Sequence, residues 1–368
     1  MPPLFDVKPL DRQVYETELR DWLPDTIFDV HTHVWLDAHK RHTADEFARV
    51  VSWPARVAKD SPIEELVESY RLLFPGKTCR ALFFGNAKPG DDLDGMNSYV
   101  SDCARRTPGY AALIWAHPDW SADELERRIE AGGFVGAKVY LNYAPSYLPG
   151  AEVRIYDFFP PHQLAVLDRR GWIGMLHIPR PARLRDPVNL AQLREIDACF
   201  PRAKIILAHV GRAYCDGDVG NAFEVLGHTH HLRWDFSANT NANVFRQLLA
   251  AMGPERVLFG SDLPILRMRM RRIERDGRYV NLVPPGLYGD ISNDPNMAEV
   301  SAAEGEQLTF FMYEELRAFK RAATAVGLTR DDLEDIFHRN AEALLADIAG
   351  AAAPAASRRR AATAQRTK

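Results

Sequence analysis

The sequence has few cysteines, and none of the four among its 368 residues belongs to a Cys-x-x-Cys pair. Their wide spacing excludes a disulfide framework or a zinc knuckle; they are Cys79, Cys103, Cys199 and Cys215. There is no excess of basic residues either, since the formal net charge is −4, which argues against a general nucleic-acid binder. No apolar run approaches the roughly 20 residues of a membrane span, and the charged N-terminus does not resemble a signal peptide. We therefore expect a cytoplasmic protein that binds neither membranes nor nucleic acid.

A Gly-x-Gly-x-x-Gly fingerprint is absent after the first apolar run, which disfavours a doubly wound dinucleotide-binding fold. Instead, eight short apolar runs alternate with amphipathic stretches. The runs are residues 26–31, 80–86, 111–118, 133–141, 171–179, 203–211, 231–238 and 255–264. Continuous apolar strands that alternate with helices indicate a parallel sheet covered by helices. Eight such units favour a closed (β/α)8 TIM barrel, with an open doubly wound α/β sheet as the alternative.

Three connections are longer than a plain barrel needs, namely residues 36–79, 142–170 and 265–305. They follow the first, fourth and eighth strands and leave from the C-terminal ends, where a barrel carries its active site. We expect them to form pocket walls or a lid. Residues 1–348 are predicted to form one barrel domain. Residues 349–368 are basic, lack large apolar side chains and are predicted to be a disordered tail.

Polar residues accumulate where the expected strands end. His31 and His33 close the first strand, and being two positions apart they point to the same face. His177, His209 and Asp262 follow strands five, six and eight. The strand ends of a barrel surround one opening, and because strands eight and one are neighbours, Asp262 falls beside the histidine pair. His177 faces these three side chains from across the barrel, and four nitrogen and oxygen ligands around an open position are the composition of a catalytic zinc or similar divalent site.

Six short motifs occur along residues 25–347: “FDVHTH”, “GFVGAKVY”, “MLHIP”, “ILAHVGR”, “LFGSDLP” and “IFHRNAEALL”. In this order they resemble the amidohydrolase superfamily, and specifically the branch that contains aminocarboxymuconate semialdehyde decarboxylase and related metal-dependent hydrolases. The resemblance implies one divalent metal ion, zinc in most members with manganese as the alternative. It implies the ligands His31, His33, His177 and Asp262. It also implies an acid/base or water-orienting role for His209, and a homodimer would be typical of the family.

Three functions remain open at this point. The leading hypothesis is a hydrolase that uses a metal-activated water on a C–O or C–N bond of a small acidic or cyclic substrate, such as a lactone, ester or amide. In it, Asp262 both touches the metal and accepts the proton of the water. The first alternative is a nonoxidative decarboxylase of an aromatic or unsaturated carboxylic acid that uses the same ligands. The second is a noncatalytic binding barrel, which the intact ligand set disfavours.

Four further residues are candidates for substrate binding. Arg180 and Arg212 each follow a site histidine by three residues and suit carboxylate recognition, although an ion pair with a neighbouring acid is an equal alternative. Lys138 is expected to face the substrate, because it appears too early in its strand to become a carbamate bridge between two metal ions. Trp35 either shapes an aromatic wall or packs in the core.

A second His-Thr-His pattern lies in “GHTHH”, residues 227–231. These histidines precede a strand instead of ending one, so they belong to the opposite end of the barrel. We interpret His228, His230 and His231 as surface residues. Asp29 shares the parity of His31 and His33, and it either hydrogen-bonds a ligand histidine or has a structural role in the strand.

Overall fold

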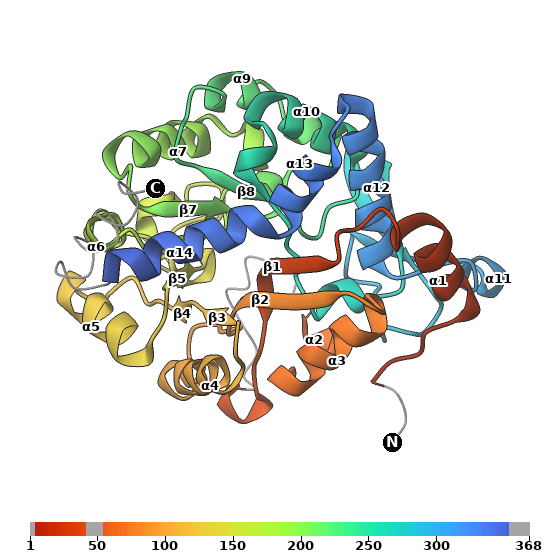
Figure 1. The fold of residues 1–368 in the computed structure, drawn as a ribbon, viewed down its shortest axis with the longest axis horizontal. Helices are drawn as coiled ribbons and strands as arrows, with labels where there is room; N and C mark the ends of the chain where they lie inside the picture. Colours follow the sequence, from red (N-terminus) through yellow and green to blue (C-terminus); the bar gives the residue numbers. More distant parts are fainter. Residues whose placement is uncertain (1–3, 42–53, 353–368) are drawn as a thin grey trace, which may run out of the picture.

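The computed structural model describes residues 4–41 and 54–352, to which all statements on structure refer. Short parallel strands lie at the centre of the molecule and helices surround them (Figure 1). The strands are β1 (Thr26–His33), β2 (Thr78–Phe84), β3 (Ala111–Ala112), β4 (Ile114–Trp115), β5 (Gly136–Val139), β6 (Ile173–Leu176), β7 (Lys204–Leu207), β8 (Arg233–Asp235) and β9 (Val257–Leu258). Neighbours along this series pair in parallel, first β1 to β3 and then β4 to β9.

Backbone hydrogen bonds join these two sheets into a ring. β3 and β4 belong to one chain segment interrupted only at Leu113, whose N–H donates to the carbonyl of Phe83 in β2 at 3.0 Å. At the other junction, the segment after β9 pairs with β1. The N–H of Val30 donates to Phe259 and the N–H of His33 donates to Leu263, both at 2.9 Å. The fold is therefore the predicted α/β TIM barrel, with β3 and β4 together forming the third of its eight strands.

Helices follow most of the strands and cover the outside of the barrel (Figure 1). They are α1 (Pro9–Val14), α2 (Pro54–Val57), α3 (Ile63–Leu73), α4 (Leu93–Arg106), α5 (Ala122–Gly132), α6 (Pro161–Arg170), α7 (Pro187–Cys199), α8 (His209–Arg212), α9 (Ala222–Leu226), α10 (Ala242–Met252), α11 (Ala302–Gly305), α12 (Phe311–Val326), α13 (Arg330–Glu334) and α14 (Asn340–Ala352). Their ends follow from local chemistry. Ser121 caps α5 by accepting from the N–H of Glu124, and Gly133 ends it at a φ of 67°, where a side chain would be strained.

Helix α14 lies across the N-terminal end of the barrel. Asn340 donates to the carbonyl of Val257 at the start of β9, and Asp347 pairs with Lys204 at the start of β7. Figure 1 shows α14 crossing over the strands. The helix continues to Ala352, so the first four residues of the predicted tail, 349–352, are helical; residues 353–368 lie outside the described residues.

The long connection after β9 folds into a small sheet of its own. It consists of β10 (Arg271–Arg275), β11 (Arg278–Val283) and β12 (Met297–Glu299), of which the first two form an antiparallel hairpin. Arg269, just before the hairpin, makes a buried two-point ion pair with Asp11 of α1, with N···O distances of 3.0 and 2.7 Å. This pair attaches the N-terminal helix to the connection that follows β9.

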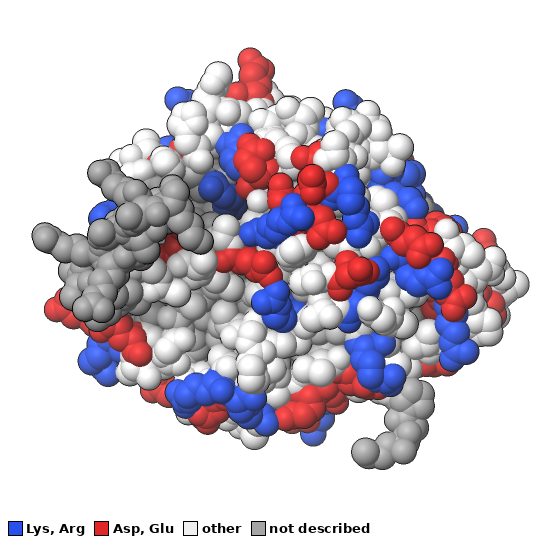
Figure 2. Space-filling model, viewed as in Figure 1, with Lys and Arg blue, Asp and Glu red and all other residues white. Residues whose placement is uncertain are grey.

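Charged side chains of both signs are interspersed over the face shown in Figure 2. Exposed ion pairs of this kind contribute at most about 1 kcal/mol each, so the fold depends chiefly on its buried apolar core. Part of that core is an aromatic cluster in which Phe236 stacks on Phe319 of α12 at 3.9 Å between ring centroids. None of the described helices has the length and apolar character needed to cross a bilayer.

Candidate metal centre

Polar side chains gather at the C-terminal ends of the barrel strands, a region we call the mouth. They are His31 and His33 in β1, Lys138 in β5, His177 after β6, His209 after β7, Asp235 in β8 and Asp262 after β9. Each of these residues is at most 9% exposed. Because buried polar groups cost free energy unless they are paired or bind something, the mouth is the candidate functional site.

Three of the predicted ligands converge on one point. Asp262 Oδ1 lies 3.2 Å from His33 Nε2 and 3.6 Å from His31 Nε2. Ligand atoms of these three residues all lie within 4.8 Å of one another. In a tetrahedral zinc site with bonds of about 2.0–2.2 Å, neighbouring ligand atoms are roughly 3.4 Å apart. The donor set of His31, His33 and Asp262 therefore fits a small divalent ion.

The other ring nitrogen of each histidine has its own acceptor. His33 Nδ1 lies 2.9 Å from the carbonyl oxygen of Gly85, which can only accept, so Nδ1 carries the proton. His31 Nδ1 lies 2.8 Å from Asp235 Oδ2. In both rings Nε2 is then left with its lone pair facing Asp262, the arrangement that metal-ligating histidines show.

Asp235 is a site residue that the sequence reasoning missed. It is fully buried at the end of β8, and with His31 and His209 it forms a second group of possible ligand atoms within 4.8 Å. The available signal was its position, because “WDF” places an acid at the end of the seventh strand just as the site histidines end theirs. That signal is weak, since many strands end in a polar residue.

Two predicted site residues have buried atoms without hydrogen-bond partners. His177 is absent from both ligand groups, and its ring lies edge-on to His209 with 5.2 Å between centroids. Its Nδ1 and the Nζ of Lys138 have no hydrogen-bond partner within the described residues. The Lys138 ammonium instead lies over the ring of Phe84, 5.1 Å from its centroid. Partnerless buried atoms of this kind suit a site that takes up a charged ligand.

The position of Lys138 corrects one expectation. We expected it too early in its strand to become a carbamate bridge between two metal ions, but β5 ends at Val139, so Lys138 is the last residue but one. Of the three residues that follow it, only Val139 belongs to the strand, whereas Tyr140 precedes and Leu141 begins a short helical turn. Lys138 thus stands at the mouth, where burial lowers the pKa of its ammonium to about 8.

Burial also determines the protonation of the histidines. It lowers the pKa of His31 to about 4 and lowers the pKa values of His177 and His209. For Asp262, burial raises the pKa, but the contact with His33 and the neighbouring His209 and His31 together outweigh it, and the pKa lies below its ordinary value. At neutral pH His31, His177 and His209 are therefore neutral and Asp262 is ionised, which are the protonation states that metal ligands need.

The backbone that carries the site is strained. The turn α8 is left-handed, with φ of 57° at His209, 50° at Val210 and 60° at Arg212, and Asp262 has φ of 50°. A left-handed conformation costs a non-glycine residue about 1–2 kcal/mol. Strain of this size persists where the surrounding structure fixes it, and it concentrates at functional sites.

Gly260 makes room beneath the site. A Cβ atom at this position would lie 2.8 Å from the Cβ of His31 and 3.2 Å from that of Ser237. The “FGSD” segment can therefore pass under the histidines only with glycine at this position, which is a packing requirement that the sequence alone does not reveal.

The two candidate arginines differ in their partners. Arg180 pairs with Asp186 at 3.1 Å, which favours the ion-pair alternative for this residue. Arg212 donates to the carbonyls of Ile178 and Pro179, both at 3.2 Å, and no carboxylate among the described residues pairs with it.

Trp35 and Asp29 also have structural partners. The indole of Trp35 is 2% exposed and donates to the carbonyl of Lys59, which favours the packing alternative. Asp29 accepts from the backbone N–H groups of His31 and Ser261 and from the hydroxyl of Tyr70. Its carboxylate thus bonds the backbone of a ligand histidine and joins β1 to the segment of Asp262; no hydrogen bond to the imidazole accompanies these contacts.

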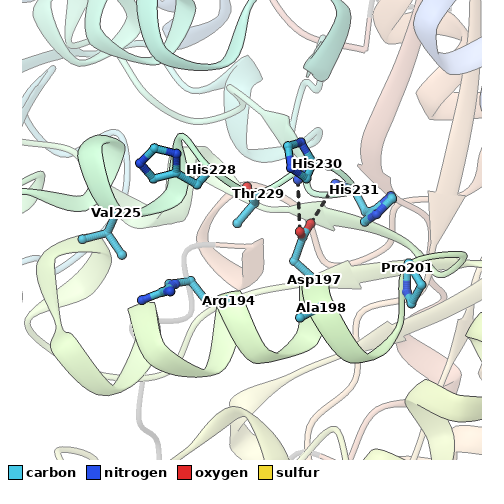
Figure 3. Close-up of a pocket in the computed structure, with 9 residues that line it drawn as sticks. All are labelled: Arg194, Asp197, Ala198, Pro201, Val225, His228, Thr229, His230 and His231. Atoms are coloured by element: carbon cyan, nitrogen blue, oxygen red, sulfur yellow. Dashed lines mark hydrogen bonds between the residues drawn. The ribbon is translucent and has the colours of Figure 1, made fainter.

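The histidines of “GHTHH” lie at the N-terminal end of the barrel, as expected, and all three are exposed. They line a cavity of about 280 Å³ together with Arg194 and Asp197 of α7. Figure 3 shows their rings pointing in different directions, while Asp197 accepts from the backbone N–H groups of His230 and His231. Within the described residues, no group of possible metal ligands includes them.

Imidazole and carboxylate side chains that converge at the strand ends of a parallel α/β barrel are typical of metal-dependent barrel enzymes. The amidohydrolase family model matches residues 28–346. No curated protein matches the chain.

Solved structures resemble the chain over most of its length. An amidohydrolase from Burkholderia multivorans with bound HEPES has 14% identity and a TM-score of 0.54, covering 87% of this chain and 99% of that one. A second crystal form of that protein holds zinc. A putative 2-pyrone-4,6-dicarboxylic acid hydrolase from Pseudomonas putida has 16% identity and a TM-score of 0.51 over 90% and 100% of the two chains. A 2,6-dihydroxybenzoate decarboxylase in complex with 2,6-dihydroxybenzoate has 14% identity and a TM-score of 0.52 over 87% and 98%.

At these identities the structures support the fold and do not identify a substrate. The family model covers most of the chain, so the chain belongs to the amidohydrolase family. Members of this family are metal-dependent hydrolases or decarboxylases, and the chain is an enzyme of this kind.

Proposed function

We propose that the protein is a metal-dependent hydrolase that cleaves a C–O or C–N bond of a small acidic substrate, such as a lactone, ester or amide. The observation that carries this proposal is the convergence of His31, His33 and Asp262 on one point in the buried mouth, with His209 beside them. We propose zinc as the ion, with manganese as the alternative, and His177 as the fourth ligand.

A divalent ion in this site supplies Lewis acidity, which polarises a substrate carbonyl and lowers the pKa of water from about 15.7 towards ~7. The residues of the chain supply the proton transfers. Asp262 has a lowered pKa and is ionised at neutral pH, so it accepts a proton from the attacking water and passes it to the leaving group. His209 is neutral, and its Nδ1 faces Ser237, so Nε2 offers a second proton acceptor at the mouth.

The acidic character of the substrate rests on Arg212. It belongs to the same strained turn as His209, and carbonyl oxygens are the only hydrogen-bond partners of its guanidinium among the described residues. Its guanidinium donates to the carbonyls of the two residues that directly follow His177, and its charge counteracts the burial that raises the pKa of Tyr140 to about 12, whose ring flanks His177. A guanidinium in this position suits a substrate carboxylate.

The proposal is tested with a panel of lactones, esters, amides and aromatic carboxylic acids. Metal-loaded protein, metal-free protein and the Asp262→Ala variant are compared, with release of the free carboxylic acid product and CO2 release measured in parallel. Release of the acid product that requires both the metal and Asp262 is the expected result. Metal-dependent CO2 release would replace the hydrolase by the decarboxylase alternative. Metal binding without turnover of any compound, or with equal turnover in Asp262→Ala, would contradict the proposed mechanism.

A further inference from the structure

The carboxylate of Asp235 forms hydrogen bonds with two site histidines, His31 and His209. Its Oδ2 lies 2.8 Å from His31 Nδ1. Its Oδ1 accepts from the backbone N–H of His209 at 2.9 Å, from the backbone N–H of Ser237 at 3.1 Å and from the Ser237 hydroxyl at 2.5 Å. Asp235 and Ser237 are both fully buried, so water does not compete for these bonds.

Ser237 extends this network to the imidazole of His209. The Ser237 hydroxyl donates its hydrogen to Asp235, so towards His209 Nδ1, at 2.9 Å, its oxygen can only accept. The carbonyl oxygen of Ser237, at 3.1 Å, can also only accept. His209 Nδ1 must therefore carry the proton, which leaves the Nε2 lone pair for the mouth. The same holds for His31, whose Nδ1 faces a carboxylate oxygen.

We propose that Asp235 is a positioning residue that sets the tautomer of two site histidines, His31 directly and His209 through Ser237. One carboxylate thereby keeps His31 Nε2 available as a metal ligand and His209 Nε2 available as a proton acceptor. The inference rests on the proposed metal site for its functional meaning, whereas the tautomers themselves are properties of the metal-free protein.

Asp235 is better suited to this role than to that of a ligand, although it belongs to a possible ligand group with His31 and His209. Two of its four hydrogen bonds come from backbone N–H groups, which can only donate and hold Oδ1 in place. A metal ion held by both Oδ2 and His31 Nδ1 would have to replace the hydrogen bond between these two atoms. In contrast, the ligand atoms around Asp262 converge without breaking either bond.

The hydrogen bonds also fix how an amide would sit at this position. In Asp235→Asn, the backbone N–H groups of His209 and Ser237 require the amide oxygen at the Oδ1 position. The NH2 group must then occupy the Oδ2 position and donate towards His31 Nδ1. His31 can accept that bond only by moving its proton to Nε2, the nitrogen that faces Asp262. The near-isosteric substitution is thus expected to reverse the tautomer of one ligand with little change in shape.

The experiment measures imidazole tautomers and metal affinity separately. Long-range ¹H–¹⁵N NMR on metal-free wild-type protein should show His31 and His209 protonated on Nδ1. In Asp235→Asn, the His31 proton should move to Nε2, and Zn²⁺ affinity in a chelator competition should fall about 10–100-fold. Asp197→Asn is the matched control, because Asp197 also accepts from backbone N–H groups but lies at the other end of the barrel. It should lower the melting temperature and leave Zn²⁺ affinity unchanged.

Nε2-protonated His31 in the wild type, or an unchanged tautomer and Zn²⁺ affinity in Asp235→Asn, would overturn the inference. The wild-type NMR measurement decides the tautomers even if the variant does not fold. If wild-type protein binds no Zn²⁺ but shows both Nδ1 protons, the proposed metal site fails and the assignment of the tautomers stands.

Discussion

The chain contains the tripeptide His-Thr-His twice, and the structure gives the two copies opposite surroundings. His31 and His33 end β1 in the mouth and are 1% and 9% exposed. Each has an acceptor on Nδ1 and directs Nε2 towards Asp262. His228 and His230 precede β8 at the other end of the barrel and are exposed. The nearby carboxylate of Asp197 is occupied by backbone N–H groups. A histidine pair thus becomes a candidate metal site through its strand end and its acceptors, and the spacing alone is insufficient.

The largest expected difference between the two regions is in catalysis. Asp262→Ala removes a ligand and the proposed proton acceptor, so kcat/KM should fall about 10³-fold or more. His228→Ala changes an exposed side chain and should leave kcat/KM within about 2-fold. The comparison fails if both variants lose activity to a similar extent, as measured on the substrate found in the panel.

Packing beneath the mouth gives the next largest effect. Gly260→Ala places a Cβ atom 2.8 Å from that of His31, and it should lower the free energy of unfolding by about 1–3 kcal/mol and weaken metal binding. Gly150→Ala meets no atom within 4 Å and should change the stability by less than about 0.5 kcal/mol. Urea unfolding of both variants checks this, and a Gly260→Ala protein as stable as wild type would contradict the close packing.

The pH dependence of the free energy of unfolding tests the burial of one carboxyl group outside the mouth. Glu315 of α12 is fully buried, and burial raises the pKa of its carboxyl well above the ordinary value. The pKa of the Glu315 carboxyl in the folded protein thus exceeds its pKa in the unfolded chain, which is about 4.3. The contribution of this carboxyl to the stability of the fold is therefore fully present below about pH 4.3, and it is lost as the pH rises towards the folded-state pKa. The stability of Glu315→Gln relative to wild type should therefore increase with pH, by at most about 1.4 kcal/mol per unit. Chemical denaturation between pH 4 and 8 measures this, and a pH-independent difference between Glu315→Gln and wild type would refute it.

The smallest predicted effect distinguishes the two arginines. Arg212→Lys keeps the charge but removes the planar guanidinium group, which can bind a carboxylate through two hydrogen bonds. KM for an acidic substrate should therefore rise about 10-fold, whereas kcat should change less. Arg180→Lys alters an existing ion pair with Asp186 and should leave KM within about 2-fold. Equal KM values for the two variants would remove Arg212 from the substrate site.

The fold and the meeting of three of the four candidate ligand side chains could be predicted from the sequence. Alternating apolar runs and helices determine a barrel, and the barrel brings the ends of β1 and β9 together, so His31, His33 and Asp262 had to meet. The contact between Asp235 and His31 could not be predicted, because it depends on the tilt of one ring and on the backbone of Ser237.

The left-handed turn α8 could not be predicted from the sequence either. Val210 is β-branched and disfavours a left-handed conformation, so no local preference of the sequence predicts φ of 50° there. Arg180 and Arg212 were indistinguishable in the sequence because each follows a histidine by three residues. Their difference arises from Asp186, which caps α7 and lies within reach of Arg180 alone.

Metal content is the most direct test of the central claim that one of the two His-Thr-His segments is a metal centre. Untagged protein purified without chelator is compared with His33→Ala and His230→Ala by elemental analysis. The account predicts one divalent ion per chain in wild type and His230→Ala, and none in His33→Ala. Full metal content in His33→Ala, or loss of the metal in His230→Ala, would contradict it.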